Sequence, residues 1–356
     1  MTNNVTPLAD LPAFQAALGE WFRANARDLP WRRTSDPYAI VVSEFMLQQT
    51  QVKTVLPYYT RWLGAFPGFA ELAVAPEERV LSLWQGLGYY SRARALHRLA
   101  KAVVATGLAD DFPRDPAEIR ELPGIGPYTA GAIAAFAFDQ PAPAVDGNIA
   151  RVLSRLFLVR EPVDSKVGLA RIWDLAAAIL PAGPGGGREQ VGAIMELGAV
   201  VCLARRPLCL LCPVRRFCAG RQELAGAVDE LPSKKSRPLQ EEREQHAIWS
   251  RDAEGRLLLQ RATGPLWRDM WHLPLVAAAA VGAPLVELSF GITRYKVRLA
   301  VQAHFAEAAY IPFRLKESAQ EESPPFQSAW FTLAELADLP IPAPHRRAIE
   351  RMLALE

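Results

Sequence analysis

Four cysteines in one short segment place the strongest constraint on how this chain folds. They occur as Cys202-x6-Cys209-x2-Cys212-x5-Cys218, and the chain holds no other cysteine. Disulfides are the alternative, but a protein of the cytosol has little use for them. Four thiolates suit either tetrahedral zinc or an iron–sulfur cluster, although zinc modules usually present two short-spaced pairs and this segment has one. The segment therefore predicts a metal centre, with zinc still open.

The hydrophobic pattern of the sequence changes once, from helical to β-like, and this change predicts two domains. The chain has 356 residues and half of them are apolar, which is enough for more than one hydrophobic core. Residues 1–225 carry alanine- and leucine-rich segments of helical pattern. The polar, charge-mixed stretch 226–245 is typical of a linker, and residues 246–356 hold short β-like runs that end in helical segments. We expect a mainly helical domain followed by a smaller α+β domain.

No segment has the pattern of a leader peptide or of a membrane span. The most apolar stretch, 273–288, is interrupted by Pro274, Pro284 and Glu287. We therefore expect a soluble protein of the cytosol that makes no contact with a membrane.

Arginines accompany the cysteines. The formal net charge is only +2, yet the segment from Cys202 to Arg221 has no acidic residue and carries Arg205, Arg206, Arg215, Arg216 and Arg221. Such a patch suits contact with phosphates, and a solvated loop is the alternative.

Residues 118–138 have the pattern of two helices joined by a tight turn. The sequence EIRELPGIGPYTAGAIAAFAF places Gly124 and Gly126 in that turn. Glycine lets backbone N–H groups and a helix N-terminus approach a phosphate, since no Cβ intervenes. Such contacts position a nucleic acid without reading its sequence. Taken alone, the pattern fits an ordinary packed helical hairpin equally well.

Two carboxylates in different surroundings are candidates for acid–base chemistry. Glu44 is flanked by apolar residues on a helix that we expect to begin at Asp36-Pro37 and to run through Leu47. Apolar surroundings favour a protonated carboxyl, which can improve a leaving group. Asp146 precedes another helix, where N–H donors keep it ionised and able to stabilise or attack a sugar cation. The alternatives are a buried structural acid and a plain N-cap.

These motifs resemble the adenine DNA glycosylase (MutY) family of the helix-hairpin-helix superfamily, over nearly the whole chain. The cysteine spacing is similar to the [4Fe–4S] loop of that family and of the endonuclease III family. The resemblance implies one [4Fe–4S] cluster on the four cysteines. It also implies base-excision repair in the bacterial cytosol by a monomer that binds double-stranded DNA, flips adenine out of a mispair with 8-oxoguanine or guanine, and hydrolyses its glycosidic bond.

The resemblance assigns the catalytic roles. It makes Glu44 the general acid and Asp146 the residue that stabilises the sugar cation, with Tyr128 and Asn148 as supporting side chains. Bifunctional enzymes similar to endonuclease III carry a lysine at the position of Tyr128 and form a Schiff base with the sugar. We therefore expect a monofunctional glycosylase, provided that no other lysine takes that role.

The resemblance also assigns the contacts with DNA. The segments 41–52 (VVSEFMLQQTQV) and 84–96 (WQGLGYYSRARAL) are similar to the family segments that enter the minor groove around a flipped nucleotide. Gln49 and Tyr89 are the expected wedges, because an aromatic ring and an amide can substitute for the stacking and pairing of a base that leaves the helix. The remaining members of the expected DNA-binding set are Arg32, Gly124 and Gly126.

Residues 246–356 resemble the Nudix-like C-terminal domain with which this family surveys the base opposite the adenine. They lack the Glu-rich Mg²⁺ box, so we expect binding rather than hydrolysis there. The family often has a Phe-Ser-His loop where this chain has the run 289–295 (SFGITRY), and commonly a polar residue where this chain has Gly192. The alternatives are therefore a glycosylase for another base, such as thymine in a T·G mispair, or a non-catalytic iron–sulfur DNA-binding protein.

Overall fold

The chain folds into two compact units. The computed structural model describes residues 8, 10–224, 226–236, 240–263, 267–276, 283–292, 294–303, 310–311 and 327–356. The helical unit comprises Met1–Val74 and Ala95–Ser236, and the mixed unit comprises Ala75–Arg94 and Arg237–Glu356.

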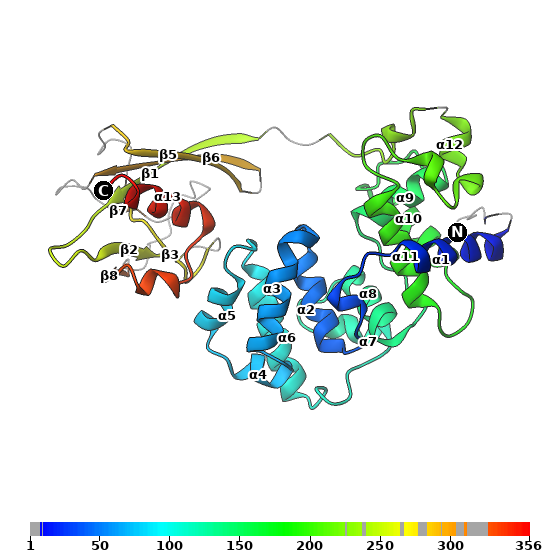
Figure 1. Ribbon diagram of the computed structural model, residues 1–356, viewed down its shortest axis with the longest axis horizontal. Coiled ribbons are helices and arrows are strands. Elements are labelled where there is room, and N and C mark those ends of the chain that lie inside the picture. Colours follow the sequence, from blue (N-terminus) through cyan, green and yellow to red (C-terminus); the bar gives the residue numbers. More distant parts are fainter. Residues whose placement is uncertain are drawn as a thin grey trace. The chain divides into compact units, whose positions relative to one another are not determined.

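The helical unit is built almost entirely of α-helices (Figure 1). In chain order they are α1 (Leu11–Asn25), α2 (Pro37–Leu47), α3 (Val52–Ala65), α4 (Phe69–Val74), α7 (Pro116–Glu121), α8 (Pro127–Phe138), α9 (Gly147–Leu156), α10 (Lys166–Ala178), α11 (Gly187–Val200) and α12 (Ala219–Glu223). The short 3-10 helices are η1 (Pro30–Arg32), η2 (Cys209–Leu211), η3 (Arg215–Phe217) and η4 (Val228–Glu230). α5 (Glu77–Trp84) belongs to the mixed unit, and α6 (Ser91–Ala105) begins in the mixed unit and ends in the helical one.

Helix α2 confirms the expected start and end. The Asp36 side chain accepts hydrogen bonds from the backbone N–H groups of Tyr38 and Ala39, and Pro37 occupies the first helical position. Every residue from Tyr38 to Met46 is buried, because α2 packs against α3, α8 and η1. The helix that carries Glu44 therefore lies inside the core.

Helices α7 and α8 form the hairpin expected over 118–138. Gly124 has φ +82°, a left-handed conformation that the turn requires and that glycine adopts without strain. Gly126 is the N-cap of α8, with Pro127 at the first helical position. The residues from Thr129 to Ala135 are buried, which explains the run of alanines.

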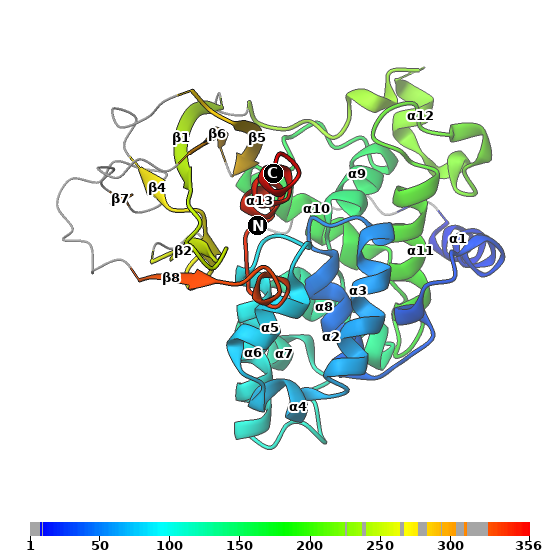
Figure 2. The same ribbon diagram turned by 60° about the vertical axis from the view of Figure 1, so that its left-hand side comes forward.

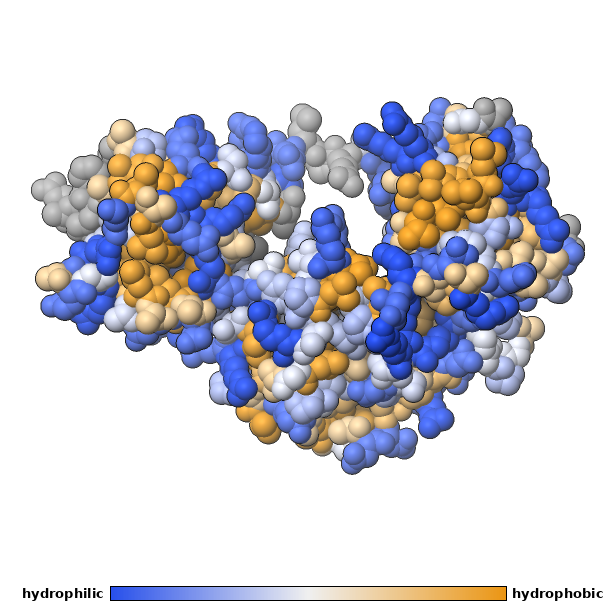
Figure 3. Space-filling model, viewed as in Figure 1, coloured by the Kyte–Doolittle hydropathy of each residue, from blue (hydrophilic) through white to orange (hydrophobic). Residues whose placement is uncertain are grey.

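Helix α11 organises the core of the helical unit. It packs against α1, α8 and α9, and their apolar faces share one cluster that includes Phe14, Leu18, Ile149 and Leu197. The Gly-rich stretch 183–186 leads directly into α11. In Figure 3 polar residues cover much of the visible surface, with an apolar area in the region of α9, α10 and α12. Within the described ranges, no helix combines the length and the hydropathy needed to cross a membrane.

The mixed unit contains two sheets and a C-terminal helix, as expected for a smaller α+β domain. The strands are β1 (Glu241–Trp249), β2 (Leu257–Arg261), β3 (Trp271–His272), β4 (Leu275–Val276), β5 (Val286–Ile292), β6 (Tyr295–Ala303), β7 (Tyr310–Ile311) and β8 (Ser328–Phe331). One sheet has the order β5-β6-β1-β4-β7, with β1 and β6 parallel, and the other has the order β3-β2-β8. Helix α13 (Ala343–Leu353) lies against β5 (Figure 2).

Two details differ from the sequence expectations. Strand β1 begins at Glu241, inside the stretch expected as a linker. Of the helical segments expected near the end of residues 246–356, the first, over 333–339, forms only the 3-10 helix η6 (Glu335–Ala337). Pro340 follows directly, and a proline disfavours helical geometry at the residue before it. The domain boundaries 1–225 and 246–356 and the likeness to Nudix domains stay predictions.

Candidate active site

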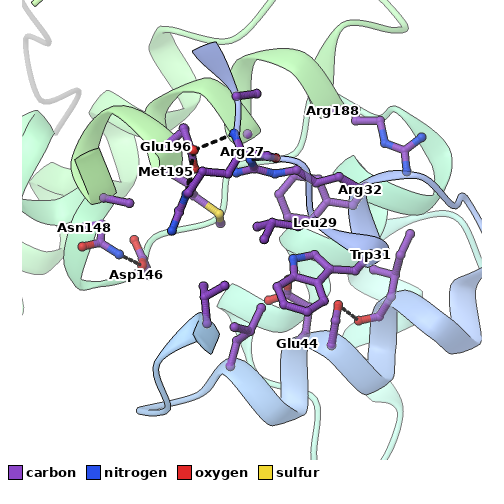
Figure 4. Close-up of a pocket in the computed structure, with 18 of the residues that line it drawn as sticks. Arg27, Leu29, Trp31, Arg32, Glu44, Asp146, Asn148, Arg188, Met195 and Glu196 are labelled. Atoms are coloured by element: carbon purple, nitrogen blue, oxygen red, sulfur yellow. Dashed lines mark hydrogen bonds and ion pairs between the residues drawn. The ribbon is translucent and has the colours of Figure 1, made fainter. Parts of the chain in front are cut away.

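One pocket of about 590 Å³ collects the residues that the sequence singled out for catalysis. Elements far apart in the sequence line it: α1, η1, α2, α8, α9 and α11. Its lining includes Phe22, Arg27, Trp31, Arg32, Glu44, Tyr128, Asp146, Asn148, Gly192 and Glu196. Figure 4 shows Glu44 and Asp146 approaching the pocket from different parts of the fold. A pocket of this size accommodates one nucleobase with its sugar.

Glu44 is an acid in an apolar setting. The residue is 4% exposed, and Oε2 has no hydrogen-bond partner in the described part of the chain. Burial raises the pKa of Glu44 to about 7, the hydrogen bond with Tyr128 acts to lower it, and the negative charge of Asp146 raises it further. The carboxyl group is therefore substantially protonated near neutral pH.

Tyr128 stands at the start of α8, and its partner is Glu44. Burial and then the neighbouring charges of Glu44 and Asp146 raise the pKa of Tyr128 well above its usual value. The phenol therefore keeps its proton and acts as a hydrogen-bond donor to Glu44. No lysine is found among the described residues that line the pocket.

Asp146 is held by donors from its own helix. Its Oδ1 accepts the backbone N–H of Ile149 at 2.7 Å, so it is the N-cap of α9, and its Oδ2 accepts Asn148 Nδ2 at 2.9 Å. These two hydrogen bonds fix the direction of both carboxyl oxygens. The N-cap role and the catalytic role therefore use the same geometry.

Arg151 orients the side chain of Asn148. Arg151 Nη2 donates to Asn148 Oδ1 at 2.8 Å and to the carbonyl of Gly198 at 2.7 Å, and its Nε donates to the carbonyl of Cys202 at 2.8 Å. Helices α9 and α11 approach closely here, because a Cβ on Gly198 would stand 2.8 Å from Asn148 Cβ. Neither Arg151 nor Gly198 is predictable as a site residue from the sequence, since neither carries a local signal.

A buried ion-pair cluster forms another part of the pocket wall, and of its residues only Arg32 was predicted from the sequence as a site residue. Glu196 is fully buried and accepts hydrogen bonds from Arg27 Nε and Nη2 and from Arg32 Nη2, each at 2.7 Å. Burial by itself would raise the pKa of Glu196, but these arginines outweigh it and lower the pKa to about 2. Arg32, expected as a DNA contact, is thus engaged with Glu196 in the pocket wall.

Phe22 occupies the space beside Gly192. A Cβ on Gly192 would stand 3.0 Å from Phe22 Cζ, and the Arg32 guanidinium lies 5.3 Å from the centroid of the Phe22 ring. The pocket therefore has an aromatic ring and a cation next to the position where the resemblance led us to expect a polar side chain.

The two wedge candidates share an unusual backbone conformation. Gln49 and Tyr89 have φ +57° and +49°, and both side chains are exposed. Positive φ is uncommon for residues other than glycine and occurs often at functional sites. Gln49 follows α2 in the helical unit, whereas Tyr89 belongs to the mixed unit.

The hairpin glycines differ from each other. A Cβ on Gly124 would stand 3.1 Å from Ala95 Cβ, whereas a Cβ on Gly126 would meet no atom within 4 Å. Gly126 therefore opens the N-terminus of α8 to the surroundings, and Gly124 serves the turn itself.

The four cysteines line one small cavity, apart from the catalytic pocket. None forms a disulfide, and among the described residues no three His, Cys, Asp or Glu side chains have the geometry to hold a single metal ion. Fully buried Arg155 places Nη1 3.4 Å from Cys202 Sγ and donates to the carbonyls of Ala204 and Leu231. Four thiols around one cavity fit a group with four sulfur ligands. All five arginines of this segment are exposed.

Comparison with known proteins identifies the class first. Residues 42–176 match the profile of the HhH-GPD superfamily, base excision DNA repair proteins. The structure of a thermostable thymine-DNA glycosylase superposes with a TM-score of 0.54 at 27% identity, covering 60% of this chain and 97% of that chain. Residues 42–176 thus have the sequence pattern of the HhH-GPD superfamily.

The relatives with similar sequences point to one kind of enzyme within this class. The adenine DNA glycosylase of Rattus norvegicus is 45% identical over 236 residues, which are 63% of this chain and 45% of that protein. The adenine DNA glycosylase of Mycolicibacterium smegmatis is 43% identical over 195 residues, which are 54% of this chain and 65% of that protein. The chain thus spans less than half the length of the mammalian relative. The resemblance to the adenine DNA glycosylase family is confirmed over about 60% of the chain.

Proposed function

We propose that this chain is a monofunctional DNA glycosylase that excises adenine mispaired with 8-oxoguanine or guanine. The observation that carries the proposal is the pairing of a neutral acid, Glu44, with a hydrogen-bonded aspartate, Asp146, in one pocket of the size of a nucleoside. The similarity to adenine DNA glycosylases at 35–45% identity supports adenine as the base.

Glu44 acts first in this mechanism, as the general acid. With a pKa of about 7 it holds a proton that it donates to a ring nitrogen of the flipped adenine, which makes the base a better leaving group. The hydrogen bond from Tyr128 holds the carboxyl group in position while the proton moves.

Asp146 acts on the sugar. As the bond between base and sugar lengthens, positive charge develops on the deoxyribose ring, and the carboxylate of Asp146 stabilises it. Asn148 and the N-terminus of α9 fix the direction of that carboxylate. Water then completes the hydrolysis. Because Tyr128 stands where a Schiff-base lysine would be needed and the described pocket lining has no lysine, the strand is left uncut.

The partner is double-stranded DNA, which the chain binds as a monomer. Gly126 and the N-terminus of α8 suit a phosphate, the arginines around the cysteines suit the backbone, and Gln49 and Tyr89 suit entry into the base stack. The mixed unit would read the opposite base, and its hairpin over 289–295 is the candidate, although Thr293 lies outside the described residues. A location in the bacterial cytosol stays a prediction.

The cofactor that we propose is one [4Fe–4S] cluster held by Cys202, Cys209, Cys212 and Cys218. When bound, it would cross-link the loop and supply no open coordination site, so its contribution would be structural or redox-tuning. Iron and sulfide analysis of the purified protein, beside zinc analysis, tests the choice of metal.

The test of the function is single-turnover release of adenine from a duplex with adenine opposite 8-oxoguanine. Glu44→Gln keeps the shape of the side chain but has no proton to donate, so release should fall at least about 100-fold. Glu20→Gln, an exposed position on α1, is the matched control and should keep full activity. Loss of activity in both variants would remove the support for Glu44 as the acid.

Three further outcomes would count against this proposal. Release of thymine from a T·G duplex, with adenine untouched, would favour a glycosylase for another base, in line with the thymine-DNA glycosylase fold match. No release from cluster-loaded protein would favour a non-catalytic DNA-binding protein. Trapping of the protein on DNA by borohydride would contradict the monofunctional mechanism.

A further inference from the structure

The loop that joins α5 to α6 has one exposed tyrosine, Tyr89, between loop residues that are buried. Tyr89 is 57% exposed, whereas Leu87 and Tyr90 are 5% and 6% exposed. The loop has positive φ at Gly86, Gly88 and Tyr89, with values of +100°, +70° and +49°. Glycine tolerates such values, but a tyrosine at positive φ is unfavourable unless the surroundings hold it there.

Two buried side chains hold the backbone of this loop. The carbonyl of Gly88, directly before Tyr89, accepts Trp84 Nε1 at 3.1 Å and Arg92 Nη2 at 3.1 Å. Arg92 Nη2 also donates to the carbonyl of Leu87 at 3.1 Å. Trp84 is fully buried and Arg92 is 7% exposed, so water competes little for these bonds.

The guanidinium group of Arg92 also contacts both rings. It lies 5.3 Å from the ring centroid of Trp84 and 5.4 Å from that of Tyr89, within the range of cation–π attraction. Burial lowers the pKa of Arg92 to about 10, so the group stays a cation at neutral pH. One planar group thus bonds the backbone before Tyr89 and supports the ring of Tyr89.

We propose that Arg92 is the positioning residue for Tyr89: it fixes the loop so that the exposed ring is presented, before DNA binds, in the conformation that enters the base stack. This inference rests on the proposed function, in which Tyr89 is a wedge. A preformed wedge loses no side-chain or loop freedom on insertion, which favours extrusion of the target base. Lysine would keep the charge but has no planar group that can face the rings while it donates to the backbone.

Other contacts hold the ends of the loop independently of Arg92. Tyr90 Oη donates to the carbonyl of Ile341 at 3.4 Å, and Arg94 pairs with Glu77 at 2.7 Å and with the carbonyl of Arg268. Replacement of Arg92 should therefore leave α5 and α6 in place and release mainly the backbone around Tyr89.

The experiment is a double-mutant cycle on base flipping with full-length, cluster-loaded protein. Flipping is followed by the fluorescence of 2-aminopurine placed at the target base, with DNA affinity and thermal stability measured beside it. Arg92→Met should slow flipping about tenfold, and Tyr89→Ala at least as much, with DNA affinity nearly unchanged. The double variant should be no slower than Tyr89→Ala alone, because Arg92 acts through Tyr89. Arg98→Met, exposed on the same helix, should match the wild type.

Each other outcome counts against the inference. If the losses of flipping rate multiply in the double variant, Arg92 does not act through Tyr89 and is only a structural residue. The same conclusion follows if DNA affinity and stability fall in parallel with the flipping rate of Arg92→Met. If Arg92→Met does not fold, Arg92→Lys keeps the cation and must still slow flipping. Unchanged flipping in Tyr89→Ala would overturn the wedge and the role of Arg92 together. Since the fluorescence signal needs no chemistry, failure to release adenine is a separate result that bears on the proposed function alone.

Discussion

Glu44 shows how burial decides chemistry at the scale of one residue. The sequence supplies a carboxyl group among apolar neighbours, and burial in the fold raises its pKa to about 7. Glu196 is equally buried, yet two arginines lower its pKa to about 2. The same functional group is therefore an acid on one wall of the pocket and a fixed anion on the other.

The pKa of Glu44 predicts how stability depends on pH. Because the folded protein binds this proton more tightly than an unfolded chain with the ordinary value of 4.5, the contribution is fully present below about pH 4.5 and is lost as the pH rises through 7. The loss amounts to about 3 kcal/mol. Urea unfolding of the wild type and of Glu44→Gln across this range should give curves that diverge by that amount, and parallel curves would contradict the pKa.

Gly198 predicts a second effect at this scale. Its missing Cβ lets α11 approach Asn148, so Gly198→Ala must displace Asn148 and with it the hydrogen bond to Asp146. We expect a loss of about 1–3 kcal/mol of stability and a lower single-turnover rate. Gly64→Ala, on α3 with nothing within 4 Å of the added methyl group, should instead gain about 0.5–1 kcal/mol. Full activity in Gly198→Ala would show that Asp146 does not depend on Asn148.

At the scale of elements, the α7–α8 hairpin separates two uses of glycine. Gly124 has a left-handed backbone and Ala95 close by, whereas Gly126 has φ −95° and open space beside it. The first glycine therefore serves folding. The second is free to serve a ligand at the N-terminus of α8.

This difference predicts opposite phenotypes for two alanine substitutions. Gly124→Ala should lose about 1–2 kcal/mol of stability because an L-residue is strained at that φ. Gly126→Ala should change stability by less than about 0.5 kcal/mol but weaken DNA binding about tenfold, since the methyl group blocks an approaching phosphate. Thermal unfolding and fluorescence anisotropy with a labelled duplex measure the two quantities. Unchanged affinity in Gly126→Ala would exclude the hairpin as a phosphate site.

At the scale of the whole molecule, the cysteine segment supplies one buried residue, Val214, to an apolar core built mainly by helices, and it adds an arginine-rich surface. Helices α1, α8, α9, α10 and α11 share that apolar cluster, and Cys202, Cys212 and Cys218 pack against it. The positions of the exposed arginines of this segment depend on the conformation of the segment.

Removal of the proposed cluster should therefore change binding more than folding. We expect chelation to leave most of the helical circular dichroism, lower Tm by several degrees, and reduce the salt dependence of DNA affinity, because about one counterion is released per phosphate contact. Reconstitution with iron and sulfide should restore both properties. An unchanged salt dependence in the chelated protein would place the DNA contacts elsewhere.

The sequence by itself determined the features that local signals encode. The Asp36-Pro37 cap predicted α2, and the paired glycines predicted the hairpin. The clustered cysteines marked out one segment of the chain, and the change in periodicity predicted a mixed domain. Each of these depends on residues only a few positions apart, so capping, backbone conformation and hydrophobic pattern were sufficient to predict them.

Only the tertiary structure decided which of these parts meet. Glu44 and Asp146 converge because α2, α8 and α9 pack together, and Arg27 finds Glu196 because α11 lies beside the start of the chain. Ala75–Arg94 groups with the distant residues from Arg237 to Glu356 in one compact unit. Such contacts join residues separated by tens to hundreds of positions, and they form through burial and close packing, which no local pattern records.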